Sequence, residues 1–362
     1  MPSIAPSRMS VPAAVVGVVV GVDTHQDEHC AAVLDHRGAH LATCTIAATP
    51  AGYAQLCSWA TRFGPVTAWG VEGTGSYGAG LARHLTGAGH TVLEVNRADR
   101  QARHQHGKSD PLDAVQAARA VLAGTTAGIP KTSDGVVEMI RNIKRVKDSA
   151  TKAKTAAINQ LHAAVVTAPD QLRQQLRGLD GVRLLRACAR LRPGPVTDPT
   201  AATKYALRTL ARRAQGLQAE CDDADRHLDI LTDQAAPTLR AAYGVGSDSA
   251  AELLVAAGDN PDRLASEASF AALCGVAPVP ASSGKTNGRF RLSRGGHRRA
   301  NAAPYRVVLS RLRWDPATRA YMDRRTKEGM SKKEIIRCLK RYLARTLYQA
   351  VLTDYTAITA MT

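Results

Sequence analysis

The stretch VVGVVVGVDTHQDEHCAAVLD, residues 15–35, decides the fold predicted for the first part of this chain. The apolar run 15–22 predicts a buried β-strand, and residues 29–35 predict a second strand that pairs with it as a hairpin. The wider run 11–22 is similar to the apolar core of a secretory leader. It is far shorter than the roughly 20 residues of a membrane span, and no small-residue cleavage motif follows it. We therefore expect a strand here, and neither a leader nor a membrane anchor.

Strand and helix patterns alternate through the next ninety residues. Period-two and apolar runs predict strands at 39–47, 66–72 and 90–95. Helical spacing predicts helices at 50–62, with Thr49 as N-cap, at 78–88 and at 110–122. Three adjacent strands followed by strand–helix repeats predict a mixed sheet flanked by helices, with an RNase H-like strand order.

The remainder of the chain is predicted to be mainly helical. A breaker-rich stretch at 124–130 marks the first expected boundary. Long helical patterns follow over 134–186, with a break at Pro169, and over 201–239; we expect them to form an antiparallel helical pair or coiled coil. The predicted domains are an α/β domain at 1–125, a helical dimerisation region at 126–240 and a basic, mainly α domain at 241–362.

The charge of the chain points to a polyanionic partner. The 362 residues carry a formal net charge of +17, and 44% of them are hydrophobic, which excludes a disordered or collagen-like chain. Between Lys285 and Arg345 there are 19 basic and 4 acidic residues, so nearly all of the excess charge lies there. Nucleic acid is the first expected partner and an anionic membrane surface the second. Only 4% of the residues are aromatic, which argues against single-strand binding by base stacking.

The seven cysteines are scattered and include no C-x-x-C pair, so they predict neither a disulfide framework nor a zinc site. We interpret them as small buried apolar residues in a protein of the reducing cytosol.

Four acidic residues stand where carboxylates from separate elements could converge. Asp23 ends the first strand, Glu72 ends the strand at 66–72, and Asp110 and Asp113 lie three apart at the start of a helix, on one face. Each acid alone could be a cap or turn residue. Together they predict a site for two Mg²⁺ ions about 3.5–4 Å apart, as in phosphoryl transfer.

The C-terminal part offers two further motifs. Gly244-Val245-Gly246 before a helix predicts either a helix-hairpin-helix grip on a DNA phosphate or a simple glycine turn. Ser282-Ser283-Gly284 predicts, by composition alone, a simple loop. The same loop could leave a hydroxyl accessible beside four cations that could stabilise a phosphate: Lys285, Arg289, Arg291 and Arg294.

These motifs jointly resemble one family. GVDTHQ (21–26), VEGTGSYG (71–78), HGKSDPLDA (106–114), YGVGSDSAAELLVAAGD (243–259) and FAALCGVAPVPASSGKTNGRFRLSRGGHRRAN (270–301) are similar to the DEDD-type transposases of insertion sequences. That family is described as bridge-RNA-guided serine recombinases, with a RuvC-like N-terminal domain and a serine-bearing C-terminal transposase domain. The resemblance covers most of the chain except the middle helices.

The resemblance implies a composite active site. Asp23, Glu72, Asp110 and Asp113 would bind Mg²⁺, and Ser283, with Ser282 as the alternative, would attack a DNA phosphate to form a covalent 5′-phosphoserine. Apart from the resemblance, the basic helical region that opens at 295–299 makes Arg298 and Arg299 candidates for contacts with a nucleic-acid backbone, although each alone could be a solvated surface residue. A structured bridge RNA would select double-stranded DNA at the element ends and the target, within a homodimer or tetramer in which one protomer's serine meets another's acids. The protein would act in the bacterial cytosol, associated with the nucleoid.

Two other functions remain open from the residues alone. A metal-dependent junction-resolving nuclease of the RuvC class would use the four acids without Ser283. A nucleic-acid-binding protein with a degenerate site would use neither the four acids nor Ser283. The presence of all four acids argues against this function.

Overall fold

The computed structural model describes residues 17–95, 109–126, 128–259, 264, 266–281, 290–293 and 295–361. The chain divides into two units, Met1–Ser133 and Asp134–Thr362. Each unit is described here by itself.

The first unit is built on a five-stranded mixed sheet. Its strands are β1 (Val18–Thr24), β2 (Glu28–Leu34), β3 (His40–Ala47), β4 (Val66–Glu72) and β5 (Val92–Val95), in the order β3-β2-β1-β4-β5. The first three strands are antiparallel neighbours, whereas β1–β4 and β4–β5 are parallel. This confirms the predicted mixed sheet and is consistent with an RNase H-like domain. The first strand begins at Val18, later than expected.

Helices cover both faces of this sheet. One face packs against α1 (Pro50–Ala60) and α2 (Ala79–Gly87) through buried Trp69, Leu56 and Leu81, and a short 3-10 helix, Thr61–Phe63, follows α1. The other face packs against α4 (Asp110–Leu122), where Val19 and Leu34 contact Ala118. Side chains alternate along a strand, so odd-numbered residues of β1 face α4.

Local signals account for the boundaries of α1. Thr49 is the N-cap, and its hydroxyl accepts a hydrogen bond from the Gly52 N–H at 3.2 Å, as the sequence predicts. Pro50 occupies the first helical turn, where the missing N–H costs nothing.

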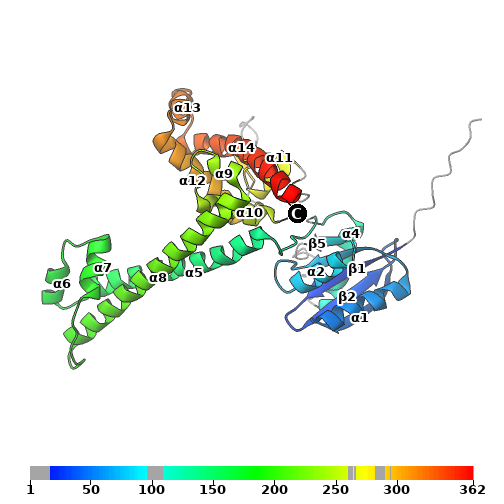
Figure 1. The fold of residues 1–362 in the computed structure, drawn as a ribbon, viewed down its shortest axis with the longest axis horizontal. Coiled ribbons are helices and arrows are strands. Elements are labelled where there is room, and N and C mark those ends of the chain that lie inside the picture. The colour runs from blue at the N-terminus through cyan, green and yellow to red at the C-terminus, as the bar shows by residue number, and fades with distance from the viewer. Residues whose placement is uncertain are drawn as a thin grey trace, which may run out of the picture. The chain divides into compact units, whose positions relative to one another are not determined.

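The second unit contains a long helical arm (Figure 1). It consists of α5 (Val136–Val166) and α8 (Pro199–Ala235), with α6 (Asp170–Leu176) and α7 (Gly181–Ala189) between them in sequence and at the far end of the arm. Polar contacts pair Lys147 with Asp225 and Lys154 with Gln218, so the residue numbers run in opposite directions and the helices are antiparallel. The helical run ends before Pro169, the predicted break.

The base of the arm joins the C-terminal helices. These elements are α9 (Pro237–Ala241), α10 (Ser247–Ala257), α11 (Glu267–Leu273), a hairpin of β6 (Pro278–Pro280) and β7 (Phe290–Leu292), α12 (Arg298–Trp314), α13 (Pro316–Lys327) and α14 (Lys332–Met361). One buried core, including Ile140, Leu228, Leu253, Phe270 and Val351, unites them with the arm. None of the helices in the described part of the chain is long and apolar enough to cross a membrane.

An ion-pair network fixes the arm to the helices at its base. The ammonium of Lys144, which is only 5% exposed, lies 2.6 Å from Asp148, 2.9 Å from Asp248 and 3.1 Å from Glu252. Asp248 stands in the first turn of α10, after the Gly244–Gly246 motif, and also binds Lys147 at 2.8 Å. The N-terminus of α10 therefore faces internal carboxylate–lysine pairs.

Candidate metal centre and nucleic-acid interface

Two of the predicted acids meet at the end of the sheet. Asp23 and Glu72 end the neighbouring parallel strands β1 and β4, and the register that pairs Val22 with Val71 sets them side by side. Both residues are buried, 6% and 8% exposed, and the carboxyl group of Asp23 interacts with that of Glu72. Two carboxylates held this close repel one another. A cation between them offsets this repulsion, so the pair suits a metal.

The other two acids come from α4. Asp110 and Asp113 stand in its first turn, and Asp113 is buried while the Asp110 side chain is 54% exposed. Their negative charges are favourable at the helix N-terminus. The structure thus brings all four predicted acids to one end of the sheet.

Two glycines let α4 lie close to the strands. A Cβ atom on Gly21 of β1 would lie 2.1 Å from the Ala114 carbonyl oxygen, and one on Gly70 of β4 would lie 2.8 Å from the Ala117 carbonyl oxygen. Both glycines face α4, as Asp23 and Glu72 do. The close approach of helix and sheet is what sets Asp110 and Asp113 beside the strand ends.

Burial and neighbouring negative charges shift the pKa of Asp23. Burial raises the pKa of its carboxyl group, and the charges of Asp113 and Asp110 raise it further, while His25 opposes them. Carboxylates that repel one another in a buried site are stabilised by a cation between them. Hard oxygen donors are the ligands that Mg²⁺ prefers. The donor set therefore fits a divalent metal.

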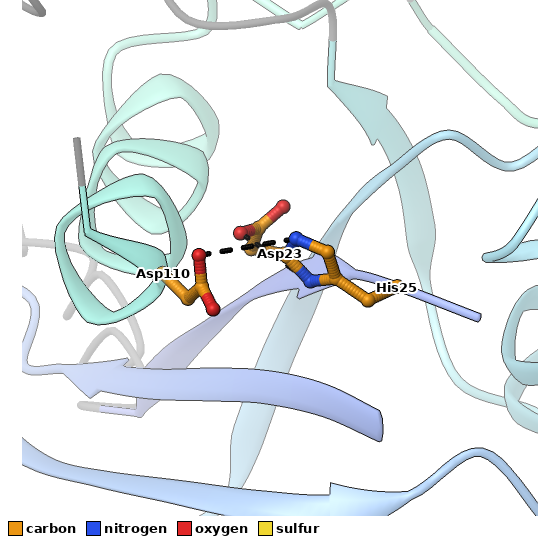
Figure 2. A group of neighbouring side chains, drawn as sticks. All are labelled: Asp23, His25 and Asp110. Atoms are coloured by element: carbon orange, nitrogen blue, oxygen red, sulfur yellow. Dashed lines mark ion pairs between the residues drawn. The ribbon is translucent and has the colours of Figure 1, made fainter. Parts of the chain in front are cut away.

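His25 joins this group, although the sequence analysis did not include it among the metal ligands. Its Nδ1 lies 3.8 Å from the Asp23 carboxylate and its Nε2 lies 3.8 Å from the Asp110 carboxylate, so the ring stands between them (Figure 2). The ligand atoms of Asp23, His25 and Asp110 all lie within 4.8 Å of one another. The available signal was the D-x-H spacing at the strand end.

A pocket of about 600 Å³ opens beside the acids. It is lined by His25, Asp110 and the exposed Tyr77, together with the first residues of β2. Beneath it, the Thr24 hydroxyl donates a hydrogen bond to the Glu72 carbonyl oxygen at 3.0 Å and ties the ends of β1 and β4 together.

Some of the residues predicted to contact nucleic acid lie in the described part of the chain, and others do not. Ser282, Ser283, Lys285, Arg289 and Arg294 lie outside the described residues. Arg291 and Arg298 line a pocket of about 550 Å³ in the second unit, together with Arg337 and Lys340, which the sequence analysis did not single out.

The structure gives Arg299 a contact within the protein. Its guanidinium forms an ion pair with Asp148 of α5, a carboxylate that also binds Lys144. Arg299 therefore helps to join α12 to the arm.

Comparison with known sequences gives a family match in each of two parts of the chain. Residues 20–168 match a family model described as "Transposase", the DEDD type of IS110 elements, and residues 236–323 match one described as "Transposase IS116/IS110/IS902 family". The first match includes the sheet with its four acids. Residues 20–168 thus match an IS110 DEDD transposase domain, and residues 236–323 match a second transposase domain of the IS116/IS110/IS902 family.

Two individual proteins are similar to parts of the chain. The "Insertion element IS900 uncharacterized 42 kDa protein" of Mycobacterium paratuberculosis is 31% identical over 148 residues, which is 40% of this chain and 37% of that protein. The "Insertion element IS110 uncharacterized 43.6 kDa protein" of Streptomyces coelicolor is 33% identical over 120 residues, 33% of this chain and 29% of that protein. The chain thus matches about a third of the length of these relatives.

Proposed function

We propose that this protein is the DNA transposase of an insertion sequence, a recombinase that cuts and rejoins DNA at the element ends and the target. The observation that carries the proposal is the convergence of Asp23, Glu72, Asp110 and Asp113 at the end of a sheet whose sequence matches a DEDD transposase family. The second family match and the basic C-terminal region support the same activity.

The four acids would hold two Mg²⁺ ions. Bound metal would supply positive charge that stabilises the developing negative charge on a scissile phosphate. Asp23, Glu72 and Asp113 are buried, so their carboxylates are held in place by the surrounding fold. Thr24 positions the end of β4 through its hydrogen bond to the Glu72 carbonyl oxygen, and His25 restrains Asp23 and Asp110 by lying between them.

Ser283, or Ser282 in its place, would provide the nucleophile. Its hydroxyl oxygen would form a bond to phosphorus while the bond from phosphorus to the 3′ oxygen breaks. The 3′ strand end would leave as a hydroxyl group carrying the proton, and the 5′ end would remain as phosphoserine. This step is supported by the resemblance of residues 270–301 to the serine-bearing transposase domain.

The partners follow from the same resemblance. A structured bridge RNA would choose the donor and target DNA, and the protein would work as a dimer or tetramer in the bacterial cytosol, near the nucleoid. The net charge of +17 is favourable for holding both nucleic acids.

Covalent trapping tests the chemistry. The wild-type protein is incubated with DNA carrying the element ends, and protein attached to DNA is separated on a denaturing gel. We expect an adduct with wild type and Ser282→Ala, and none with Ser283→Ala. An adduct with Ser283→Ala that disappears in Ser282→Ala moves the nucleophile to Ser282.

Metal dependence is tested in the same assay. Asp23→Asn is expected to abolish strand cleavage, and normal cleavage by this variant would contradict the metal assignment. Cleavage by wild type and by both serine variants with no adduct in any of them would favour a junction-resolving nuclease instead.

A further inference from the structure

The second unit contains a cationic pocket whose four positive side chains come from three separate elements. Arg291 comes from β7, Arg298 from the start of α12, and Arg337 and Lys340 from α14. Among the described residues that line this pocket of about 550 Å³, none is acidic. Four positive side chains around one space repel one another unless an anion lies between them.

Lys340 differs from the arginines because it is buried. The residue is only 7% exposed, and its ammonium donates to the side-chain oxygen of Asn301 at 2.8 Å. In the described part of the chain, no carboxylate lies within 4 Å of this ammonium. A buried ammonium is costly unless it is paired or fully hydrogen-bonded, and it has three N–H donors. Lys340 therefore has donors to offer to a ligand in the pocket.

The neighbouring thiol does not supply the missing negative charge. Burial raises the pKa of Cys274 to about 12, so this group is neutral at physiological pH. Burial also lowers the pKa of Lys340, as expected for an ammonium without a carboxylate partner.

Asn301 holds Lys340 in a fixed direction. Its amide nitrogen donates to the carbonyl oxygens of Cys274 and Gly275, at 2.9 and 2.8 Å, which leaves the amide oxygen as the acceptor for Lys340. Because both ends of the amide are engaged, the lysine ammonium is positioned before any ligand binds.

The backbone around the pocket also suits an anion. A Cβ atom on Gly296 would lie 2.2 Å from the backbone nitrogen of Gly275, so these two segments touch and form a compact wall. The helix α12 begins at Arg298, and its N-terminal end carries partial positive charge.

We propose that Lys340, Arg337, Arg298 and Arg291 form a pocket that binds one phosphodiester group of a nucleic-acid backbone. Guanidinium groups match the geometry of phosphate oxygens, and an ammonium adds a compact point charge. The choice of nucleic acid over another phosphate rests on the proposed function, whereas the anion site rests on the pocket itself. The proposal gives Arg337 and Lys340 a specific role. The sequence alone does not distinguish them from the many other cations of the C-terminal region.

Binding measurements on the full chain test this pocket. The probes are a fluorescent DNA duplex and an RNA duplex of the same length, and affinity is measured by anisotropy at several salt concentrations. We expect Lys340→Met and Arg337→Gln each to weaken binding about tenfold. Each should lower the slope of log affinity against log salt by about one, as for one lost phosphate contact.

Arg319→Gln is the matched control. Arg319 is an exposed arginine of α13 that does not line the pocket, and its replacement removes one positive charge as the test variants do. We expect it to bind both probes as wild type does. Lys340→Met should also keep the melting temperature of wild type, because methionine fills the space without a buried charge. Arg337 is exposed, so its variant provides a test that does not depend on burial.

The outcomes separate the pocket from the proposed activity. A loss specific to the two pocket variants supports the proposal, and the probe that is affected shows whether DNA or RNA supplies the phosphate. Unchanged affinity in both variants, or an equal loss in Arg319→Gln, overturns it. Tight binding by wild type without any recombination would contradict the proposed function and leave the pocket standing.

Discussion

The backbone of Gly21 on β1 lies against the carbonyl oxygen of Ala114 on α4, so closely that a Cβ atom at Gly21 would be 2.1 Å from that oxygen. Gly21→Ala must therefore push α4 away from the sheet. We expect a loss of about 1–3 kcal/mol in the free energy of unfolding, typical of overpacking. DNA cleavage should fall further than stability alone explains, because Asp110 and Asp113 move with α4. Urea unfolding and cleavage assays measure the two effects.

Gly87→Ala provides the control for this substitution. Gly87 ends α2 in the same unit, and a Cβ atom there would meet no atom within 4 Å apart from its chain neighbours and the backbone of its own helix. We expect it to leave both stability and cleavage near wild-type values. If Gly21→Ala also behaves as wild type, the close approach of α4 does not position the acids.

Divalent metal should stabilise the first unit through Asp23. Without metal, Asp23→Asn is expected to raise the melting temperature, because it removes one charge from a repelling group. Mg²⁺ at ten times its dissociation constant should stabilise wild type by about 1.4 kcal/mol and should not stabilise Asp23→Asn. Thermal unfolding with and without Mg²⁺ gives both results.

Asp35→Asn tests whether the metal response is local. Asp35 follows β2 at the opposite end of the sheet, where its carboxylate accepts the N–H groups of Arg37 and Ala39 at 2.9 and 2.8 Å. An asparagine can accept the same two bonds. The Asp35→Asn protein should therefore keep the full Mg²⁺ effect, and losing it would show that the metal binds elsewhere.

Two threonines join β1 and β4 at opposite ends. Thr24 donates to the Glu72 carbonyl oxygen at 3.0 Å beside the acids, and Thr67 donates to the Val18 carbonyl oxygen at 3.1 Å at the far end. Replacing either by valine should cost about 1 kcal/mol of stability. Only Thr24→Val should weaken Mg²⁺ binding and slow cleavage. Equal activity in the two variants would contradict the positioning role of Thr24.

The ion-pair network at the base of the arm should make stability depend on pH. Burial alone would raise the pKa of Asp248, but hydrogen bonds from Lys147 and Lys144 outweigh it and lower the pKa from 3.8 to about 2. A carboxyl group with a lowered pKa contributes stability above its unfolded pKa and loses it as the pH falls through the folded value. Asp248 should therefore contribute about 2 kcal/mol above pH 4, lost between pH 3.8 and 2.

Asp248→Asn tests this dependence by urea unfolding at several pH values. The variant should be less stable than wild type at pH 7, and the difference should shrink as the pH approaches 2. Asp223→Asn, which removes an exposed carboxylate paired with Arg226 on α8, should show no such dependence. A difference that stays constant with pH would rule out the network as its source.

Much of the first unit could be predicted because its signals are local. The strand at Val66–Glu72 and the helix at Asp110–Leu122 have the predicted bounds, since apolar periodicity and turn residues define them within a few residues. The convergence of the acids could be predicted as well, because parallel neighbouring strands end at the same edge of a sheet. His25 was harder to place, because its position between Asp23 and Asp110 depends on how far α4 reaches over the strand end.

The pocket in the second unit could not be predicted from the same kind of signal. Lys340 is one of 19 basic residues in its region, and its burial arises from contact with Asn301, 39 residues earlier in the chain. One clue was present: Lys340 shares a helix face with Ile336, Leu343 and Leu347, which pack in the core. A cation on the apolar face of a helix calls for a structural explanation, and composition alone does not provide one.

The arm has a separate hydrophobic core at its tip. Leu161, Leu172, Leu184 and Leu207 form it with α6 and α7, apart from the core at the base. The 37 residues of α8 extend about 55 Å, and this one helix contributes Leu207 to the core at the tip and Leu228 to the core at the base. The length of α8 therefore sets the separation between the tip and the base of the arm, and a change of sequence at the tip leaves that separation constant. The tip and the base of the arm are therefore joined by continuous helix, with no loop between them that could change their separation.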